Sequence, residues 1–220
     1  MEKTDRVVIY GLGKFAQVAM HYLKCDSPYE VVAFTVDKDY LESDAEFGLP
    51  VVPFEDIEKT YPPDQYRMLV AIGYSDNNRL RAKKYDAAKA KGYKLITYVN
   101  SRTAIWGEVE IGDNCFIFEN QTIQPFTRIG SDVVLWSGNH VGHHSTIGDH
   151  CFISSHVVIS GGASIGPYSF LGVNSCIRDG IHIAEGSVIG MGAVVVKDTA
   201  EGGVYIGTAA KRYVKESKGA

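Results

Sequence analysis

The chain lacks any run of eighteen apolar residues, and it lacks an excess of basic charge. Because a transmembrane helix needs about 20 apolar residues, we expect no such helix and no membrane partner. The chain has 22 lysines and arginines against 26 aspartates and glutamates, which gives a formal net charge of −4. This balance argues against nucleic acid as the main partner. The charged residues 1–6 lead into a strand pattern rather than a signal peptide, which favours a cytoplasmic protein.

Cysteine is also scarce, and its spacing excludes a CxxC motif. The four cysteines are Cys25, Cys115, Cys151 and Cys176. Cys115 and Cys151 fall on inward positions of the repeat described next. We therefore expect buried free thiols in a reducing cytoplasm rather than a disulfide framework.

An aliphatic residue recurs at every sixth position from Val99 to Val195. A period of six fits neither a helix nor a simple strand, but it is typical of a solenoid of short strands and tight turns. Three six-residue faces make one coil, so residues eighteen apart stack about 4.8 Å apart along the axis. The pattern predicts a parallel β-helix over residues 96–198, followed by a capping tail at 199–220.

Residues 1–95 follow a different pattern, in which short apolar runs alternate with helical stretches. The expected strands are 6–10, 30–36, 50–53 and 66–72, and the expected helices are 17–24, 54–59 and 78–91. This alternation predicts a small parallel-sheet α/β domain of the Rossmann-like kind.

A glycine pattern, Gly11-x-Gly13-x-x-Ala16, follows the first expected strand and matches part of the dinucleotide-binding fingerprint. Too few strands precede the solenoid for a full dinucleotide fold. A single nucleotide is therefore favoured, with its pyrophosphate near the helix N-terminus. The alternative is that the glycines only form a tight turn between strand and helix.

Four of the seven histidines lie between positions 140 and 150. His143 comes two residues after the inward Val141 and is expected at an outward corner. Eighteen residues later stands Gly161, so the space beside His143 is expected to be empty and open to a ligand. Gly162 stands in the same relation to His144 and would widen this gap. The alternative interpretation is that these histidines are solvated turn residues.

Imidazole is the natural general base near neutral pH. The chain has no GxSxG nucleophile motif, which favours direct transfer over a covalent intermediate. His140 is a second candidate for the base. A metal is the competing use, but His144, His150 and His156 are spaced by six and are predicted on three different corners, too far apart to share an ion. We expect no metal, which leaves a metal-dependent hydratase as a weak alternative.

The hexapeptides resemble those of the left-handed parallel β-helix family, and the whole chain resembles the bacterial sugar acetyltransferases of that class. The group with sialic acid O-acetyltransferases and the N-acetyltransferase of UDP-linked bacillosamine is most similar. Three sets of motifs carry the resemblance: residues 7–13 with Asp37 and 71–73; residues 143–148 with 160–166; and residues 170–176 with 203–212.

The resemblance implies a homotrimer in which acetyl-CoA lies in the groove between subunits and His143 is the catalytic base. His144 stands where the family usually has an acidic residue that orients the imidazole. Gly161, Gly162 and Gly190 would approach the cofactor, and Lys211 and Arg212 would meet its phosphates. The nucleotide of a nucleotide-sugar substrate would contact the following residues of the N-terminal domain: Gly11, Gly13, Lys14, Asp37, Lys38, Ile72 and Gly73.

The expected activity is therefore acetyl transfer from acetyl-CoA to an amino group of a nucleotide-linked sugar, in surface glycan biosynthesis. A sugar O-acetyltransferase and a non-catalytic scaffold remain as alternatives. Four aromatic residues fall on outward positions of the repeat and would need to be covered, which favours association of subunits into a trimer. These residues are Phe116, Phe118, Trp136 and Phe152.

Overall fold

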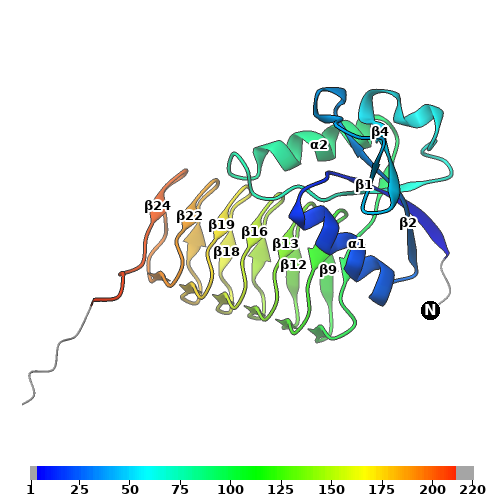
Figure 1. Ribbon diagram of the computed structural model, residues 1–220. Helices are drawn as coiled ribbons and strands as arrows, with labels where there is room; N and C mark the ends of the chain where they lie inside the picture. Colours follow the sequence, from blue (N-terminus) through cyan, green and yellow to red (C-terminus); the bar gives the residue numbers. More distant parts are fainter. Residues whose placement is uncertain (1–3, 212–220) are drawn as a thin grey trace, which may run out of the picture.

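The N-terminal domain is a six-stranded sheet flanked by helices (Figure 1). The computed structural model describes residues 4–211. The strand order is β3-β4-β2-β1-β5-β6, and all neighbouring pairs are parallel except β3–β4. The elements are β1 (Asp5–Tyr10), α1 (Lys14–Asp26), β2 (Tyr29–Val36), η1 (Lys38–Tyr40), β3 (Ala45–Glu46), β4 (Leu49–Pro53), η2 (Phe54–Lys59), β5 (Arg67–Val70), α2 (Arg79–Ala90) and β6 (Lys94–Leu95). The predicted α/β domain with a small parallel sheet is confirmed.

Two local details differ from the sequence expectation. Helix α1 begins at Lys14, immediately after Gly13, and not at Gln17. Its first turn therefore lies directly at the end of β1. The short strands β3 and β6 were not expected, because elements of two residues leave no periodic signal.

The second region is a parallel β-helix whose strands pair across steps of eighteen residues, as Phe116 does with Val134. Its three sheets run along the solenoid. The covered sheet, so named because the N-terminal domain packs on it, contains β7 (Tyr98–Val99), β10 (Phe116–Ile117), β13 (Val134–Leu135), β16 (Phe152–Ile153), β19 (Phe170–Leu171), β22 (Val188–Ile189) and β24 (Val204–Tyr205). The second sheet contains β8 (Ala104–Ile105), β11 (Thr122–Ile123), β14 (His140–Val141), β17 (Val158–Ile159), β20 (Cys176–Ile177) and β23 (Val194–Val195). The third sheet contains β9 (Val109–Ile111), β12 (Thr127–Ile129), β15 (Thr146–Ile147), β18 (Ser164–Ile165) and β21 (His182–Ile183).

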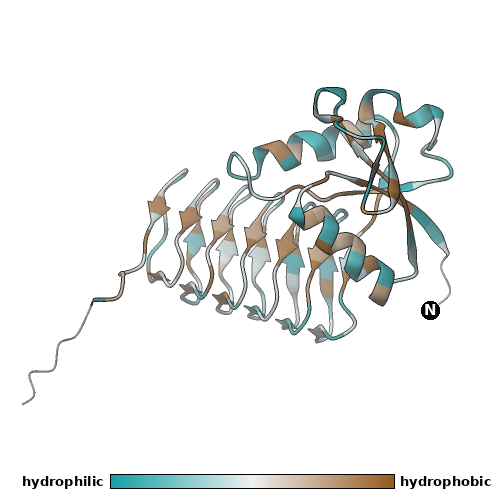
Figure 2. Cartoon of the chain, viewed as in Figure 1, coloured by the Kyte–Doolittle hydropathy of each residue, from teal (hydrophilic) through white to brown (hydrophobic). Residues whose placement is uncertain are grey.

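The six-residue aliphatic series forms the core of the solenoid. Every member from Ile117 to Ile189 is buried, and Figure 2 shows these hydrophobic bands recurring from strand to strand. Ile105 is 40% exposed because it lies in the first coil, next to the open end. Cys115 and Cys151 are buried and free, as predicted, and burial raises the pKa of each thiol to about 12. Neither thiol is therefore reactive at neutral pH.

The aromatic residues predicted to need a partner subunit are covered by the chain's own N-terminal domain. Phe15 of α1 packs with its ring centroid 5.6 Å from that of Phe116, and Tyr22 packs 4.9 Å from Phe118. Phe116, Phe118 and Phe152 are all buried in a cluster shared by the two domains. The prediction that these aromatics require association was wrong, because the packing of one domain on the other cannot be seen in the repeat itself.

The solenoid continues past residue 198 into the segment expected to be a tail. Strand β24 pairs with β22, with Val204 opposite Val188, and Tyr205 packs against the core. This last step is sixteen residues long instead of eighteen, so it falls outside the strict period. Neither α1 nor α2, the two α-helices of the described part of the chain, combines the length and hydrophobicity needed to span a membrane.

Candidate active site

His143 and His144 lie at the corner between the second and third sheets, just after β14 and before β15. This histidine corner is the edge of the solenoid that does not border the covered sheet. His144 has a φ of +58°, a left-handed turn conformation that histidine adopts more readily than most residues. The turn therefore projects two adjacent imidazoles outward, and both side chains are exposed.

The space over Gly161, beside the His143 backbone, is occupied by the His143 imidazole. A Cβ added to Gly161 would lie 2.8 Å from both Cε1 and Nε2 of His143, closer than real contacts allow. The expectation of an empty surface at Gly161 was therefore wrong. The ring packs onto the glycine backbone of the next coil, so the absence of a side chain there makes room for the imidazole rather than for a ligand.

His144 forms a hydrogen bond with the Nδ1 atom of His143. The two Nδ1 atoms are 3.1 Å apart, so one of them donates a hydrogen bond to the other. His144 in turn packs against Phe126, with 4.8 Å between the ring centroids. The backbone N–H of His143 donates to Oε1 of Gln124 at 2.9 Å. A second imidazole thus occupies the orienting position at which an acidic residue was expected by resemblance.

A cavity of about 310 Å³ adjoins this corner on the side of the third sheet. It is lined by Glu108, Glu110, Phe126, Thr127, Arg128, His144 and Thr146. The histidine corner therefore borders an open space that can admit a ligand.

The remaining histidines lie elsewhere on the solenoid. His140 is in β14 on the flat of the second sheet, between Thr122 and Val158 of the neighbouring coils. His150 and His156 follow β15 and β16, at the other two corners. Among residues 4–211, no cluster of three or more histidine, cysteine, aspartate or glutamate side chains is arranged to hold a metal ion.

The second feature is a cavity of about 640 Å³ in the N-terminal domain, at the carboxyl ends of the parallel strands. Six of the seven predicted substrate residues line it, namely Gly11, Gly13, Lys14, Asp37, Ile72 and Gly73. Lys38 is not among the lining residues, and its backbone N–H donates to the carboxylate of Glu55. Tyr10, Lys83 and Lys84 also line the cavity and were not predicted. The contribution of the two lysines depends on where α2 crosses the end of the sheet, for which the sequence has no local signal.

Asp37 is held between two of these unexpected residues. The hydroxyl of Tyr10 donates to one carboxylate oxygen, and the ammonium of Lys84 donates to the other. Burial opposes ionisation of Asp37, but the hydrogen bonds from Lys84 and Tyr10 outweigh it and lower the pKa of the carboxyl. Burial and the bond to Asp37 raise the pKa of the Tyr10 hydroxyl. Asp37 is therefore a fixed negative charge beside Lys14, Lys83 and Lys84.

The glycines and cations assigned to the cofactor differ in their surroundings. The N–H of Gly162 donates to the carbonyl of His143 at 2.8 Å, which ties the next coil to the histidine corner. The N–H of Gly190 donates to the carbonyl of Tyr205 at 2.7 Å, so strand β24 covers it. Lys211 is exposed and lies outside any helix or strand, and Arg212 lies outside the described residues.

Comparison with known proteins agrees with this two-part architecture. The model of the PglD N-terminal domain matches residues 6–88, and the bacterial transferase hexapeptide model matches residues 126–161. PerB from Caulobacter crescentus, solved in complex with CoA and GDP-perosamine, is 29% identical, and the match covers 93% of this chain and 95% of that chain with a TM-score of 0.82. The acetyltransferase domain of PglB from Neisseria gonorrhoeae FA1090 is 24% identical, with 96% of this chain and 100% of that chain covered and a TM-score of 0.82.

WeeI from Acinetobacter baumannii AYE is also 24% identical, with 93% of this chain and 97% of that chain covered and a TM-score of 0.71. The two structures at 24% identity establish a shared fold. The two family models match the two parts of the chain separately, and the PerB match covers both parts together. The chain thus combines a PglD-type N-terminal domain with the hexapeptide repeats of bacterial transferases, in the arrangement seen in PerB.

Proposed function

We propose that this protein transfers an acetyl group from acetyl-CoA to an amino group of a nucleotide-linked sugar. The observation that carries the proposal is the exposed His143 imidazole, whose Nδ1 is hydrogen-bonded to Nδ1 of His144, in a chain that also has a nucleotide-sized cavity lined by three lysines. Of the similar structures, PerB holds both CoA and the amino-sugar nucleotide GDP-perosamine.

His143 acts as the general base in this proposal. For Nε2 to accept a proton, Nδ1 must carry the hydrogen, so His143 donates and the neutral Nδ1 of His144 accepts. This bond orients the ring and stabilises the imidazolium that forms during the reaction. Gly161 beneath the ring and Gln124 at its backbone limit its movement.

The transfer is direct. The nitrogen of the sugar amine forms a bond to the thioester carbonyl carbon while its proton passes to Nε2 of His143. The tetrahedral intermediate then collapses, the carbon–sulfur bond breaks, and the departing thiolate of CoA takes the proton from the imidazolium. The products are an amide and free CoA, and the base is regenerated.

The cavity of the N-terminal domain would hold the nucleotide. Lys14, Lys83 and Lys84 supply positive charge for a diphosphate, and α1 directs its N-terminus toward the same space. The space beside Gly13 is open, because a Cβ at this position would meet no atom within 4 Å. Tyr40 and Leu80 provide apolar surface for a base.

A homotrimer would bring the two sites together. The N-terminal domain packs on the covered sheet, whereas His143 lies at the corner that does not border this sheet. A single nucleotide-sugar cannot easily reach both from one chain. A neighbouring copy that places its solenoid corner against this N-terminal domain completes the site. Sedimentation at low concentration should show trimers.

A thiol-release assay tests the activity with acetyl-CoA and a panel of UDP-, dTDP- and GDP-linked amino sugars. Each amino sugar is paired with the analogue that has a hydroxyl in place of the amine. Release of CoA with at least one amino sugar, and slower release with its hydroxyl partner, is the expected result. Release with the hydroxyl series alone would make the protein an O-acetyltransferase. No release, together with no binding of acetyl-CoA, would indicate a scaffold.

A further inference from the structure

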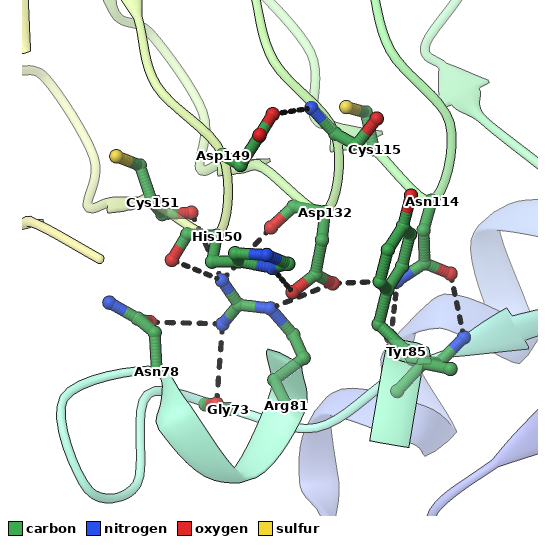
Figure 3. Close-up of polar contacts among 12 residues, drawn as sticks. Gly73, Asn78, Arg81, Tyr85, Asn114, Cys115, Asp132, Asp149, His150 and Cys151 are labelled. Atoms are coloured by element: carbon green, nitrogen blue, oxygen red, sulfur yellow. Dashed lines mark hydrogen bonds and ion pairs between the residues drawn. The ribbon is translucent and has the colours of Figure 1, made fainter. Parts of the chain in front are cut away.

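A fully buried arginine joins the N-terminal cavity to the solenoid. Arg81 of α2 and Asp132 of the solenoid are both completely buried, with 3.1 Å between Nε and Oδ1 (Figure 3). The other guanidinium nitrogens donate to carbonyls of both domains. Nη2 reaches the carbonyls of Asp132, His150 and Cys151, and Nη1 reaches the carbonyl of Gly73 at 3.3 Å.

The solenoid side of this contact is a column of stacked turns. We call these the seam turns, at the corner between the third sheet and the covered sheet. They are Asn114, Asp132, His150, Tyr168 and Gly186, each eighteen residues after the last and each with a φ between +54° and +67°. In this conformation the turns direct side chains and carbonyls toward the N-terminal domain.

One carboxylate gathers the polar contacts of this column. Oδ1 of Asp132 accepts from Arg81 and from Nδ2 of Asn114 at 2.7 Å, and Oδ2 accepts from Nδ1 of His150 at 2.9 Å. Tyr85 packs its ring edge against His150 from the side of α2. A buried charge needs this many partners, because an unpaired one is strongly destabilising.

The same network holds both ends of a segment of the nucleotide cavity. The side chain of Asn114 accepts from the N–H of Val70 at 2.8 Å and donates to its carbonyl, while Arg81 holds the carbonyl of Gly73. Residues 70–73 thus have solenoid-linked contacts at each end, and Ala71, Ile72 and Gly73 line the cavity.

This segment is also in contact with the glycine loop, residues 11–13, which connects β1 to α1. A Cβ added to Gly11 would lie 2.9 Å from the carbonyl oxygen of Ala71. The N–H of Ala71 itself bonds to the carbonyl of Tyr10. A shift of residues 70–73 would therefore be transmitted to the loop that begins α1.

We propose that Arg81 and Asn114, linked through Asp132, are positioning residues that set the shape of the nucleotide site. The inference rests on the proposed function, because it assumes that a nucleotide occupies the N-terminal cavity. Neither side chain lines the cavity, so each acts through the backbone of residues 70–73. The solenoid is then a template for the substrate site as well as the support for the histidine corner.

Arg81→Lys tests the proposal, because lysine keeps the charge but cannot span Gly73, Asp132 and His150 with one fork of donors. Asn114→Gly is the second variant. Glycine accepts the positive φ at this position and removes both bonds to Val70 and the bond to Asp132, while Arg81 and Asp132 keep their own side chains. Asn77→Gly is the matched control, since glycine accepts the positive φ of Asn77 and the bond that it removes goes to Gly186 in the same seam and not to residues 70–73.

Each variant is titrated with GDP and with UDP by calorimetry, and amide hydrogen exchange is followed at residues 70–73. Arg81→Lys and Asn114→Gly should each bind the better diphosphate about tenfold more weakly, with faster exchange in this segment. Their KM for acetyl-CoA should stay within about twofold of wild type. Asn77→Gly should bind the diphosphate as wild type does.

The possible failures can be told apart. If wild type binds neither GDP nor UDP, the proposed function of the N-terminal cavity falls and the inference falls with it. If wild type binds and both variants, though less stable, bind equally well, the network is merely structural and only the inference is overturned. If Arg81→Lys does not fold, the result with Asn114→Gly decides.

Discussion

The seam turns and the histidine corner are two edges of the same solenoid, and both use residues with positive φ. At the seam, Asp132 and His150 are buried and bonded to several groups of both domains. At the histidine corner, His143 and His144 are exposed and bonded to each other. Buried polar groups are satisfied by the fold and stabilise it, whereas exposed imidazoles with free nitrogens are available to a substrate.

The largest expected effect is at the histidine corner and concerns activity. His143→Ala should lower kcat by about 10²–10⁴-fold, because the general base is lost. Its free energy of unfolding should change by less than about 0.5 kcal/mol, since the side chain is exposed. Steady-state kinetics and urea unfolding measure the two quantities.

His156→Ala is the control for that change. His156 is also exposed and also packs over a glycine of an adjacent coil, because a Cβ on Gly138 would lie 2.5 Å from its ring. It should keep wild-type activity. Equal losses in the two variants would mean that His143 has no special role.

The largest effect on stability is expected at the seam. Asp132→Asn keeps the shape and tolerates the positive φ, but it leaves the buried Arg81 without its counter-charge. Removing one partner of a buried ion pair should cost about 3–5 kcal/mol of unfolding free energy. A loss below about 1 kcal/mol in urea unfolding would show that the seam is less important to the fold than its burial implies.

Gly161→Ala should have an intermediate effect on activity, smaller than that of His143→Ala. The backbone of Gly161 does not have a positive φ, so alanine fits the chain, but its Cβ would collide with the His143 ring. We expect kcat to fall about 10–100-fold through displacement of the base. In the background of His143→Ala the same change should have no further effect on kcat. Additive losses would mean that Gly161 acts independently of His143.

The smallest expected effect is a pH dependence at Asp113, the residue before the seam-turn residue Asn114. Burial opposes ionisation of Asp113, but hydrogen bonds from Lys89, Tyr85 and Ser131 outweigh it and lower the pKa of its carboxyl. A carboxyl with a lowered folded-state pKa stabilises the fold above its unfolded pKa of about 3.9, and this contribution is lost as the pH falls through the lower folded value. Urea unfolding between pH 7 and pH 3 should therefore show a shallower acid loss in Asp113→Asn than in wild type. Identical slopes would contradict this assignment.

The prediction from sequence was correct wherever the same type of residue recurs at equivalent positions of the fold. The aliphatic series from Val99 to Val195 specified the coils, since each inward position depends only on the same position one coil away. The strand–glycine–helix pattern located most of the cavity lining for a similar reason. It missed Lys84, whose role depends on the path of α2 over the sheet.

The sequence by itself determined that the chain has a nucleotide-type domain followed by a solenoid, because periodicity and local turn signals are properties of neighbouring residues and of positions eighteen apart. Only the tertiary structure decided that Phe116 and Phe118 are covered within one chain, that the His143 ring itself fills the space over Gly161, and that Arg81 reaches Asp132 across 51 positions. Those outcomes depend on how one domain docks and how one ring turns. They follow from the packing of surfaces against each other and from the need to pair buried charges, and the repeat pattern of the sequence encodes neither.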